Sequence, residues 1–313
     1  MQYRQLGHSD LRVSVAGLGC NGFARTPGRG LDQAETDAVV GAALDAGITL
    51  FDTARRYGDG NSEVYLGRAL GSRRDEAIIA TKFGLELDPD NGGSRAYITK
   101  AVETSLRALG TDRIDLYQLH TPDPATPIAE TLGALDELVD QGKIRHYGSS
   151  NLLGWQLADA HWTAATAGLR GFVSAQNEWS LLHRQIETEV VPACEHFGLG
   201  ILPYFPLASG LLTGKIARDE APHPDSRLAH APPARRLLTE GNFDVVEAVD
   251  AWARAHGRSL LEVALSWLAS QAVVSSVISG AMTPEQVRQN VQLTKTDLTA
   301  EEVAEVRSLL GGI

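Results

Sequence analysis

Four polar residues of different chemistry stand at or just beyond the ends of three short apolar runs in this chain. Asp52, Lys82 and His120 each end such a run, and Tyr57 follows Asp52 by five residues. If the runs are neighbouring parallel strands, all four side chains reach one edge of the sheet, where folds of this kind hold their active sites. A carboxylate, a phenol, an amine and an imidazole placed together can protonate a carbonyl oxygen while a hydride reaches the carbon.

The division of roles follows from ordinary acidities. Tyrosine is a weak acid with a pKa of about 10, and a neighbouring ammonium lowers that pKa because it stabilises the phenolate. We expect Lys82 to be that neighbour, Asp52 to keep the buried Lys82 charged, and His120 to hold the carbonyl oxygen or share the Tyr57 proton. One polar residue at a strand end is unremarkable, and Lys82 alone would more often be a surface lysine. Four complementary groups on three successive strands are hard to explain as solvated surface.

Composition excludes several other functions. The 313 residues are 43% hydrophobic and 21% charged, and the net charge of −11 is spread along the chain, which argues against nucleic-acid binding. We expect a cytoplasmic protein because neither a signal peptide nor an apolar run of about 18 residues is present. Cys20 and Cys194 are expected to be free thiols. The histidines and cysteines lack metal-ligand spacing, so no metal site is expected.

Strand-like and helix-like segments alternate along the chain, and glycines follow most of the helical ones. The predicted strands are residues 13–19, 48–53, 77–83, 114–120, 144–150, 172–177, 200–206 and 273–280, and the helical stretches include residues 34–46, 62–70, 96–109, 128–141, 153–166 and 185–197. This order predicts one (β/α)8 TIM barrel domain over residues 1–313. A doubly wound sheet competes, but it would need a glycine-rich turn that opens a helix, and residues 17–22 lead into a loop.

Two segments interrupt the alternation. Residues 3–6 and 11–13 flank a turn at 7–10, which predicts an N-terminal β-hairpin that could plug the N-terminal end of the barrel. After the seventh strand, residues 210–242 form a long insertion rich in Pro, Arg and His. We expect an irregular lid or binding loop there.

Three segments with the catalytic candidates, residues 52–58, 80–84 and 117–120, resemble the corresponding segments of the aldo-keto reductase superfamily. Residues 17–21, 148–151, 175–178, 204–207, 211–215 and 280–286 continue the resemblance in the family's order over nearly the whole chain. The short C-terminal end resembles bacterial-type members. The ordered set is specific, although each segment alone is weak.

The resemblance implies a nicotinamide cofactor. Ser150, Asn151 and Gln176 would bind the nicotinamide carboxamide, and Tyr204 would stack on its ring. The other residues implied for the cofactor are Cys20, Asn21, Asp52, Phe205, Pro206, Leu207, Ser209, Leu211, Lys215, Gly280, Ala281, Met282, Thr283, Gln286, Gln289 and Asn290. Many members that prefer NADPH carry a cation where this chain has Met282 and Gln286, whereas Arg227 resembles an arginine that folds over the cofactor. We expect NADP(H), with NAD(H) as the alternative.

The substrate would contact Phe23, Arg56, Phe83 and Trp179, together with Arg25 and the insertion. Arg56 hints at a polar or anionic substrate, or is simply a solvated loop charge. The predicted function is reduction of aldehydes or ketones, or oxidation of sugars or alcohols, with Tyr57 as general acid.

One alternative is a non-catalytic or slow nicotinamide-binding regulatory subunit of the same fold, similar to channel-associated β subunits. A metal-dependent sugar isomerase or hydrolase would need clustered ligands that this chain lacks. The expected partner is a small carbonyl or sugar molecule, without nucleic acid or membrane, and the oligomeric state stays open.

Overall fold

Eight parallel strands form the centre of the protein. The computed structural model describes residues 1–25, 30–85, 92–220, 227–230, 232–294 and 298–311. The strands pair in the order β10-β3-β4-β5-β6-β7-β8-β9. Their bounds are β3 Ala16–Gly19, β4 Leu50–Asp52, β5 Ile78–Phe83, β6 Ile114–Leu119, β7 Ile144–Ser150, β8 Ser174–Gln176, β9 Gly200–Ile201 and β10 Val277–Gly280.

Backbone hydrogen bonds also join the two edges of this sheet. The Ile201 N–H donates to the Val273 carbonyl at 2.8 Å, and the Ile278 N–H donates to the Pro203 carbonyl at 3.0 Å. The strands therefore curl into a barrel, and a doubly wound sheet with open edges is excluded. The predicted α/β barrel is confirmed, and the carboxyl ends of its strands meet at one end.

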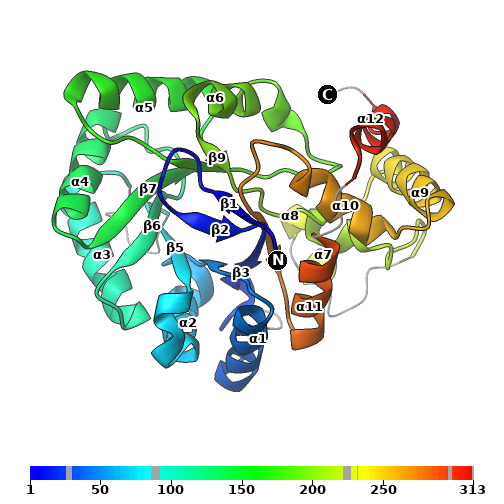
Figure 1. The fold of residues 1–313 in the computed structure, drawn as a ribbon, viewed down its shortest axis with the longest axis horizontal. Coiled ribbons are helices and arrows are strands. Elements are labelled where there is room, and N and C mark those ends of the chain that lie inside the picture. Colours follow the sequence, from blue (N-terminus) through cyan, green and yellow to red (C-terminus); the bar gives the residue numbers. More distant parts are fainter. Residues whose placement is uncertain (26–29, 86–91, 221–226, 231, 295–297, 312–313) are drawn as a thin grey trace.

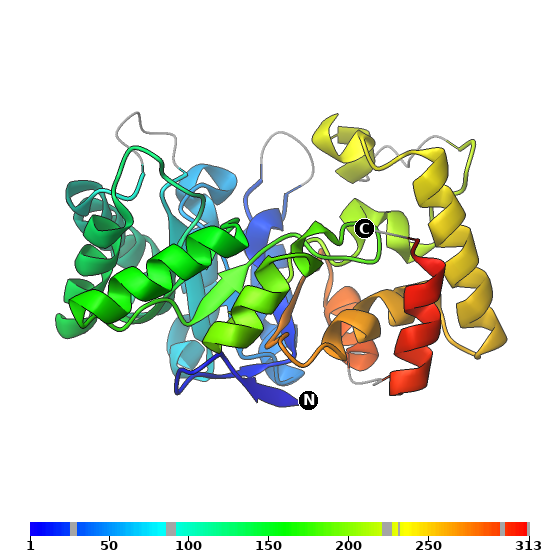
Figure 2. The same cartoon turned by 90° about the horizontal axis from the view of Figure 1, so that it is seen from above.

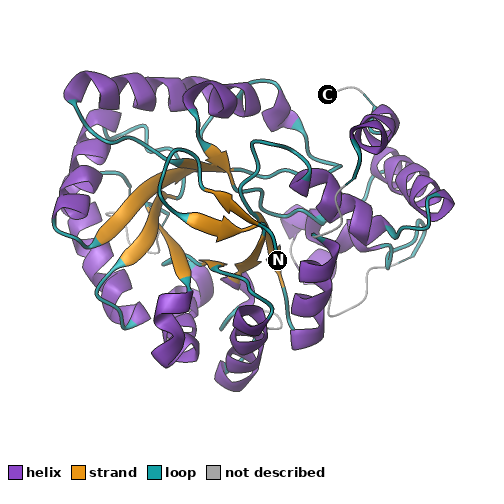
Figure 3. Ribbon diagram, viewed as in Figure 1, coloured by secondary structure: helices purple, strands orange, loops and turns teal. Residues whose placement is uncertain are grey.

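Helices surround the barrel (Figures 1 and 3). The α-helices are α1 Gln33–Asp45, α2 Asn61–Leu70, α3 Arg95–Leu109, α4 Ile128–Asp140, α5 Gly154–Ala167, α6 Val190–Phe197, α7 Arg227–His230, α8 Pro232–Arg235, α9 Glu240–Ala255, α10 Leu260–Ala269, α11 Pro284–Leu293 and α12 Ala300–Leu309. The 3-10 turns are η1 Cys20–Gly22, η2 Tyr57–Gly60, η3 Gly71–Glu76, η4 Gln185–Glu187 and η5 Ala208–Thr213. Several helices begin at a residue whose side chain accepts a backbone N–H, as Asp32 does for α1 and Thr283 for α11.

The N-terminal hairpin closes the end of the barrel where the strands begin. β1 Tyr3–Gln5 pairs antiparallel with β2 Arg12–Ser14, and the hairpin lies across the barrel (Figures 1 and 2). Leu6 and Leu11 are buried against the inward-facing side chains of the strands, including Leu50 and Leu116. The predicted hairpin and its position are confirmed.

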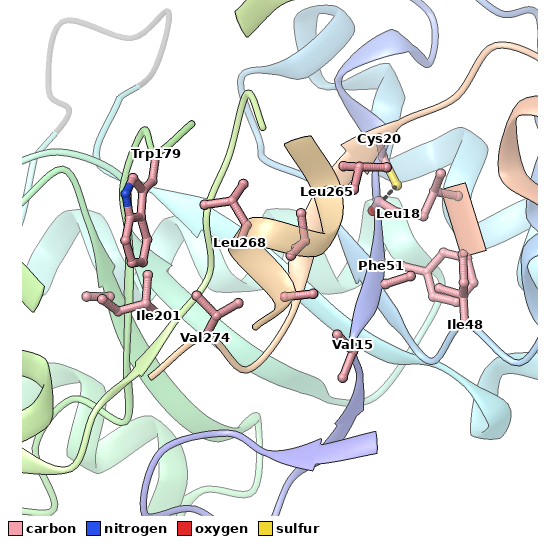
Figure 4. Close-up of a cluster of buried hydrophobic side chains, with 14 of the residues drawn as sticks. Val15, Leu18, Cys20, Ile48, Phe51, Trp179, Ile201, Leu265, Leu268 and Val274 are labelled. Atoms are coloured by element: carbon pink, nitrogen blue, oxygen red, sulfur yellow. Dashed lines mark hydrogen bonds between the residues drawn. The ribbon is translucent and has the colours of Figure 1, made fainter. Parts of the chain in front are cut away.

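The larger hydrophobic core lies outside the barrel, between the strands and the helices. Figure 4 shows part of it, with Leu265 and Leu268 of α10 beside Leu18 of β3 and Ile201 of β9. Because a strand exposes alternate side chains to opposite faces, the barrel interior and this outer layer draw on different residues of each strand.

Several predicted strands are shorter in the structure, and three predicted segments differ from it in kind. Residues 13–19 are not one strand, because Arg12–Ser14 pairs within the hairpin while Ala16–Gly19 pairs within the barrel. The stretch 185–197 contains η4 and then α6. The insertion at 210–242 is not an irregular loop throughout, since α7 and α8 lie within it and α9 begins at Glu240. Thr239 caps α9 by accepting the Asn242 N–H, a local signal that the sequence already carried.

Candidate active site

Asp52, Lys82 and His120 lie together because β4, β5 and β6 are adjacent and parallel. Asp52 is paired with Ala80 across β4 and β5, and Lys82 is paired with Gln118 across β5 and β6. The Lys82 ammonium lies 2.6 Å from Asp52 Oδ2, and the side chains are 0% and 4% exposed. Such a buried pair is stable only as a pair, because either charge alone would lack a partner.

The three protons of the Lys82 ammonium have three acceptors. Nζ donates to Asp52 Oδ2 at 2.6 Å, to the Thr53 carbonyl at 2.9 Å and to the Tyr57 hydroxyl oxygen at 3.4 Å. Burial alone would lower the pKa of Lys82, but the interactions with Asp52 and Tyr57 outweigh it and raise this pKa. These interactions favour the charged form of Lys82 beside the Tyr57 oxygen.

His120 is held in its neutral form. Burial, together with the positive charges of Lys82 and Arg56, lowers the pKa of His120 to about 3. Its ring stands edge-on to the ring of Tyr57, with centroids 6.0 Å apart and an interplanar angle of 84°. A neutral imidazole beside the phenol can offer one N–H and one acceptor nitrogen to a polar ligand.

The second carboxylate oxygen of Asp52 binds two amides. Gln176 Nε2 donates to Oδ1 at 2.8 Å, and Gln118 Nε2 donates to the same oxygen at 3.3 Å. Gln118 was not among the predicted site residues, although it lies two residues before His120. In a strand, this spacing puts both side chains on one face, which was the signal that could have identified Gln118.

Tyr204 is linked to His120 by hydrogen bonds through Asn151. The Tyr204 hydroxyl donates to Asn151 Oδ1 at 2.8 Å, and Asn151 Nδ2 donates to the His120 carbonyl at 2.9 Å and to Ser150 Oγ at 3.1 Å. Burial raises the pKa of Tyr204 to about 12, with a further contribution from Glu178. Tyr204 is therefore a neutral phenol that presents an anchored aromatic ring.

A cavity of about 670 Å³ opens over these residues, which is within the usual size range of ligand sites. The residues predicted for the site that line it are Asn21, Arg25, Asp52, Tyr57, His120, Ser150, Asn151, Gln176, Tyr204, Phe205, Pro206, Leu207, Ser209, Gly280, Ala281, Met282, Thr283 and Gln286. The lining residues that were not predicted for the site are Gly19, Gly22, Leu85, Gly210, Ile278 and Ser279. Lys82 lies behind Tyr57 and Asp52, outside the lining.

The cavity wall suits a long polar ligand with an aromatic end, such as a nicotinamide dinucleotide. Amide and hydroxyl groups surround the anchored Tyr204 ring at one part of the wall, and the N-terminus of α11 at Thr283 forms another. The Ser279 hydroxyl is buried in this wall without a hydrogen-bond partner among the described residues. Buried polar groups are rarely left unpaired, so this hydroxyl fits a polar ligand.

Several residues predicted for the cofactor lie outside the cavity lining. Cys20 and Leu211 are fully buried, and Lys215 and Gln289 are exposed. Asn290 is buried and donates to the Gly280 carbonyl at 3.3 Å, so it supports the wall. Arg227 begins α7, but its side chain falls outside the part of the chain that is described.

Of the predicted substrate residues, Arg25 lines the cavity, but the other four do not. Phe23, Phe83 and Trp179 are fully buried away from its wall, and the exposed Arg56 does not line it. Phe83 packs on Tyr117 at 4.7 Å between ring centroids, and Trp179 donates its indole N–H to Glu187 at 3.0 Å. Because Lys82 points inward, its neighbour Phe83 must point outward to the helices. These three contacts with substrate remain predictions that the geometry does not support.

Two further features bear on the class of protein. Among the described residues, no three His, Cys, Asp or Glu side chains gather in a way that could hold a metal ion. No helix in the described ranges combines the length and apolarity needed to cross a membrane. Cys20 and Cys194 are both buried free thiols, as predicted.

Comparison with known proteins agrees with this geometry. Residues 17–310 match the model of the aldo/keto reductase family. The chain is 36% identical over 301 residues to a probable voltage-gated potassium channel subunit beta of Oryza sativa subsp. japonica, covering 93% of this chain and 90% of that protein. It is 33% identical over 307 residues to probable aldo-keto reductase 1 of Glycine max, covering 96% and 87%.

A third relative is bacterial. The uncharacterized oxidoreductase YrpG of Bacillus subtilis (strain 168) is 34% identical over 328 aligned positions, covering 100% of this chain and 97% of that protein. The chain therefore belongs to the aldo/keto reductase family, a class of barrel-shaped oxidoreductases.

Proposed function

We propose that the protein is an NADP(H)-dependent oxidoreductase that reduces aldehydes or ketones, or oxidises the corresponding alcohols or sugars, with Tyr57 as general acid. The observation that carries this proposal is the direct contact of the Lys82 ammonium with the Tyr57 hydroxyl oxygen at the edge of the cavity. A phenol that receives a hydrogen bond from a buried cation is a stronger acid than a free one.

Each of the four central side chains, Asp52, Tyr57, Lys82 and His120, has a proposed task. When bound, the dinucleotide supplies or accepts the hydride. Tyr57 donates its proton to the carbonyl oxygen, and Lys82 stabilises the phenolate that remains. Asp52 keeps Lys82 charged, while neutral His120 orients the carbonyl oxygen by a hydrogen bond.

The residues of the cavity wall support a proposed orientation of the bound cofactor. Ser150, Asn151 and Gln176 would bind the carboxamide, and the Tyr204 ring would lie against the nicotinamide. Phe205, Pro206, Leu207 and Ser209 would line the pyrophosphate, with Gly280, Ala281, Met282 and Gln286 around the adenosine. In the wall, Gln286 Oε1 accepts the Met282 N–H at 2.7 Å, so it is already engaged. We therefore keep Arg227 as the proposed contact for the 2′-phosphate of NADP(H).

The proposed reaction takes place in one domain that spans residues 1–313. The family match over residues 17–310 and the hairpin packed into the barrel support this. The proposed substrate is a small carbonyl compound or sugar that enters the part of the cavity near Tyr57, His120 and Leu85.

Steady-state turnover tests this function against its alternative. The alternative is a non-catalytic or slow nicotinamide-binding regulatory subunit, which the similarity to a probable channel subunit beta favours. NADPH and NADH oxidation would be followed by absorbance with a panel of sugars, α-dicarbonyls, pyridoxal and aromatic aldehydes. Repeated turnover with any of them supports an enzyme. NADPH binding with at most one slow turnover for every member of the panel would favour the regulatory subunit.

A further inference from the structure

Gln118 lies at the centre of the polar groups under the cavity, yet the proposed chemistry gives it no task. It is 0% exposed and lies on the inward face of β6, between the apolar Leu116 and the polar His120. A buried primary amide has two N–H donors and one carbonyl acceptor, and leaving these unpaired is costly. A glutamine at this depth therefore needs an explanation.

The Gln118 amide connects two groups of different function. Its Nε2 donates to Asp52 Oδ1 at 3.3 Å, and its Oε1 accepts from Gln176 Nε2 at 3.3 Å. Gln176 itself donates to Asp52 Oδ1 at 2.8 Å. The two amides and the carboxylate thus form a closed triangle of hydrogen bonds. Gln176 is the corner that lines the cavity together with Asp52, and Gln118 is the corner behind it.

We propose that Gln118 is a positioning residue, which fixes the Gln176 amide for the nicotinamide carboxamide and orients the Asp52 carboxylate that holds Lys82. This inference rests on the proposed function of the cavity. The terminal torsion of a glutamine side chain has broad minima, so an amide is held in one orientation only by its hydrogen bonds. Gln118 supplies the Gln176 amide with a second acceptor beside Asp52 Oδ1.

The first test asks whether the loss of Gln118 weakens binding of the nicotinamide half of the cofactor and leaves binding of the adenosine half unchanged. Gln118→Met keeps the length of the side chain but removes both hydrogen-bonding groups. We expect NADPH to bind about tenfold more weakly, as loss of one positioned hydrogen bond predicts. Adenosine 2′,5′-bisphosphate, which lacks nicotinamide, should bind unchanged. Isothermal titration measures both affinities, and thermal unfolding followed by circular dichroism checks the fold.

Leu116→Met is the matched control. Leu116 is on the same strand and the same inward face, but it packs in the apolar layer with the hairpin. Leucine-to-methionine changes in a core usually cost little stability. This variant should bind both ligands as the parent does. Equal weakening of NADPH and the bisphosphate by Gln118→Met, no weakening of NADPH, or the same selective loss in Leu116→Met would overturn the proposal.

The second test uses a side chain of the same shape with a charge. In Gln118→Glu, the new carboxyl lies about as close to Asp52 Oδ1 as the amide did, and two carboxylates so near cannot both ionise easily. The other titratable or charged groups that act in this region are Lys82 on β5, Tyr57 in η2, His120 after β6, Cys20 in η1 and Arg56 just before η2. When protonated, the new carboxyl can donate to Asp52 as the amide does. When ionised, it repels Asp52 and competes for Lys82.

We therefore expect Gln118→Glu to recover much of the parent turnover and NADPH affinity at low pH and to lose both as the pH rises. Gln118→Met should be impaired equally at every pH where the parent is active. A Gln118→Glu profile that is parallel to that of the parent would overturn the proposal. The affinity measurements need no turnover. If the parent protein is inactive but Gln118→Met still loses NADPH affinity selectively, the proposed reaction is contradicted and this inference stands.

Discussion

The Lys82 ammonium donates a hydrogen bond to the hydroxyl oxygen of Tyr57, across 3.4 Å. Because Tyr57 is the acceptor in this contact, its own hydrogen is left for another partner, and the cavity lies on that side. Asp52 and the Thr53 carbonyl occupy the other two ammonium protons. The arrangement fixes the direction in which a proton can leave Tyr57, which is the property that a general acid requires.

Removal of the Tyr57 hydroxyl should abolish most of the turnover and leave cofactor binding intact. Tyr57→Phe keeps the ring, so turnover should fall by about 10²-fold or more, while NADPH affinity, measured by quenching of tryptophan fluorescence, changes little. Tyr65→Phe on α2, outside the cavity lining, is the matched control and should be active. Near-normal turnover of Tyr57→Phe would remove Tyr57 from the proposed mechanism.

Lys82 and Tyr57 should act as one unit. Lys82→Met removes the cation that stabilises the phenolate, so we expect a loss of turnover comparable to that of Tyr57→Phe. The double variant should be far less impaired than the product of the two single losses, as is usual for groups that act together. Lys143→Met, which removes a half-exposed partner of Glu103, is the control. Multiplicative effects in steady-state kinetics would argue that Lys82 does not tune Tyr57.

The buried neutral His120 should make the fold less stable in acid. Its pKa is about 3 in the native protein, against about 6.5 when unfolded, so the unfolded chain binds more protons between these values. This contribution is absent above pH 7 and grows as the pH falls, reaching about 2 kcal/mol of lost stability at about pH 5. Urea unfolding should show a weaker dependence on pH in His120→Asn over this range. A slope as steep as that of the parent would contradict the neutral, buried state.

Arg227 is the proposed contact for the cofactor's 2′-phosphate. A charge-assisted hydrogen bond is worth about 1.5–3 kcal/mol, so Arg227→Ala should weaken NADPH binding by about ten- to a hundredfold and leave NADH nearly unchanged. Arg288→Ala is a suitable control, because Arg288 already pairs with Glu285 on the surface of α11. Isothermal titration with both cofactors decides the question. Equal weakening of both would place Arg227 at the pyrophosphate, and no weakening would favour another cation or an NAD-dependent enzyme.

The sequence alone was sufficient to predict the barrel and the meeting of Asp52, Tyr57, Lys82 and His120 at one end of it, whereas their catalytic roles stay predictions. Strand alternation, helix periodicity and the glycines that end helices are local properties, so they can be read without knowledge of distant contacts. Asp52, Lys82 and His120 were identified because each stands at the end of a short apolar run. Parallel strands in a barrel bring these positions to one end whatever their separation along the chain.

Tertiary structure decided which side chains reach the cavity and how they are oriented. The hydrogen bonds of Gln176 to Asp52 and of Tyr204 to Asn151 join residues far apart in sequence, and strand register with barrel closure sets their distances. Phe83 and Trp179 match the expected residue types but are buried away from the cavity. Whether a residue faces the ligand or the core depends on the whole packed layer around it, and this information is absent from any single segment of the sequence.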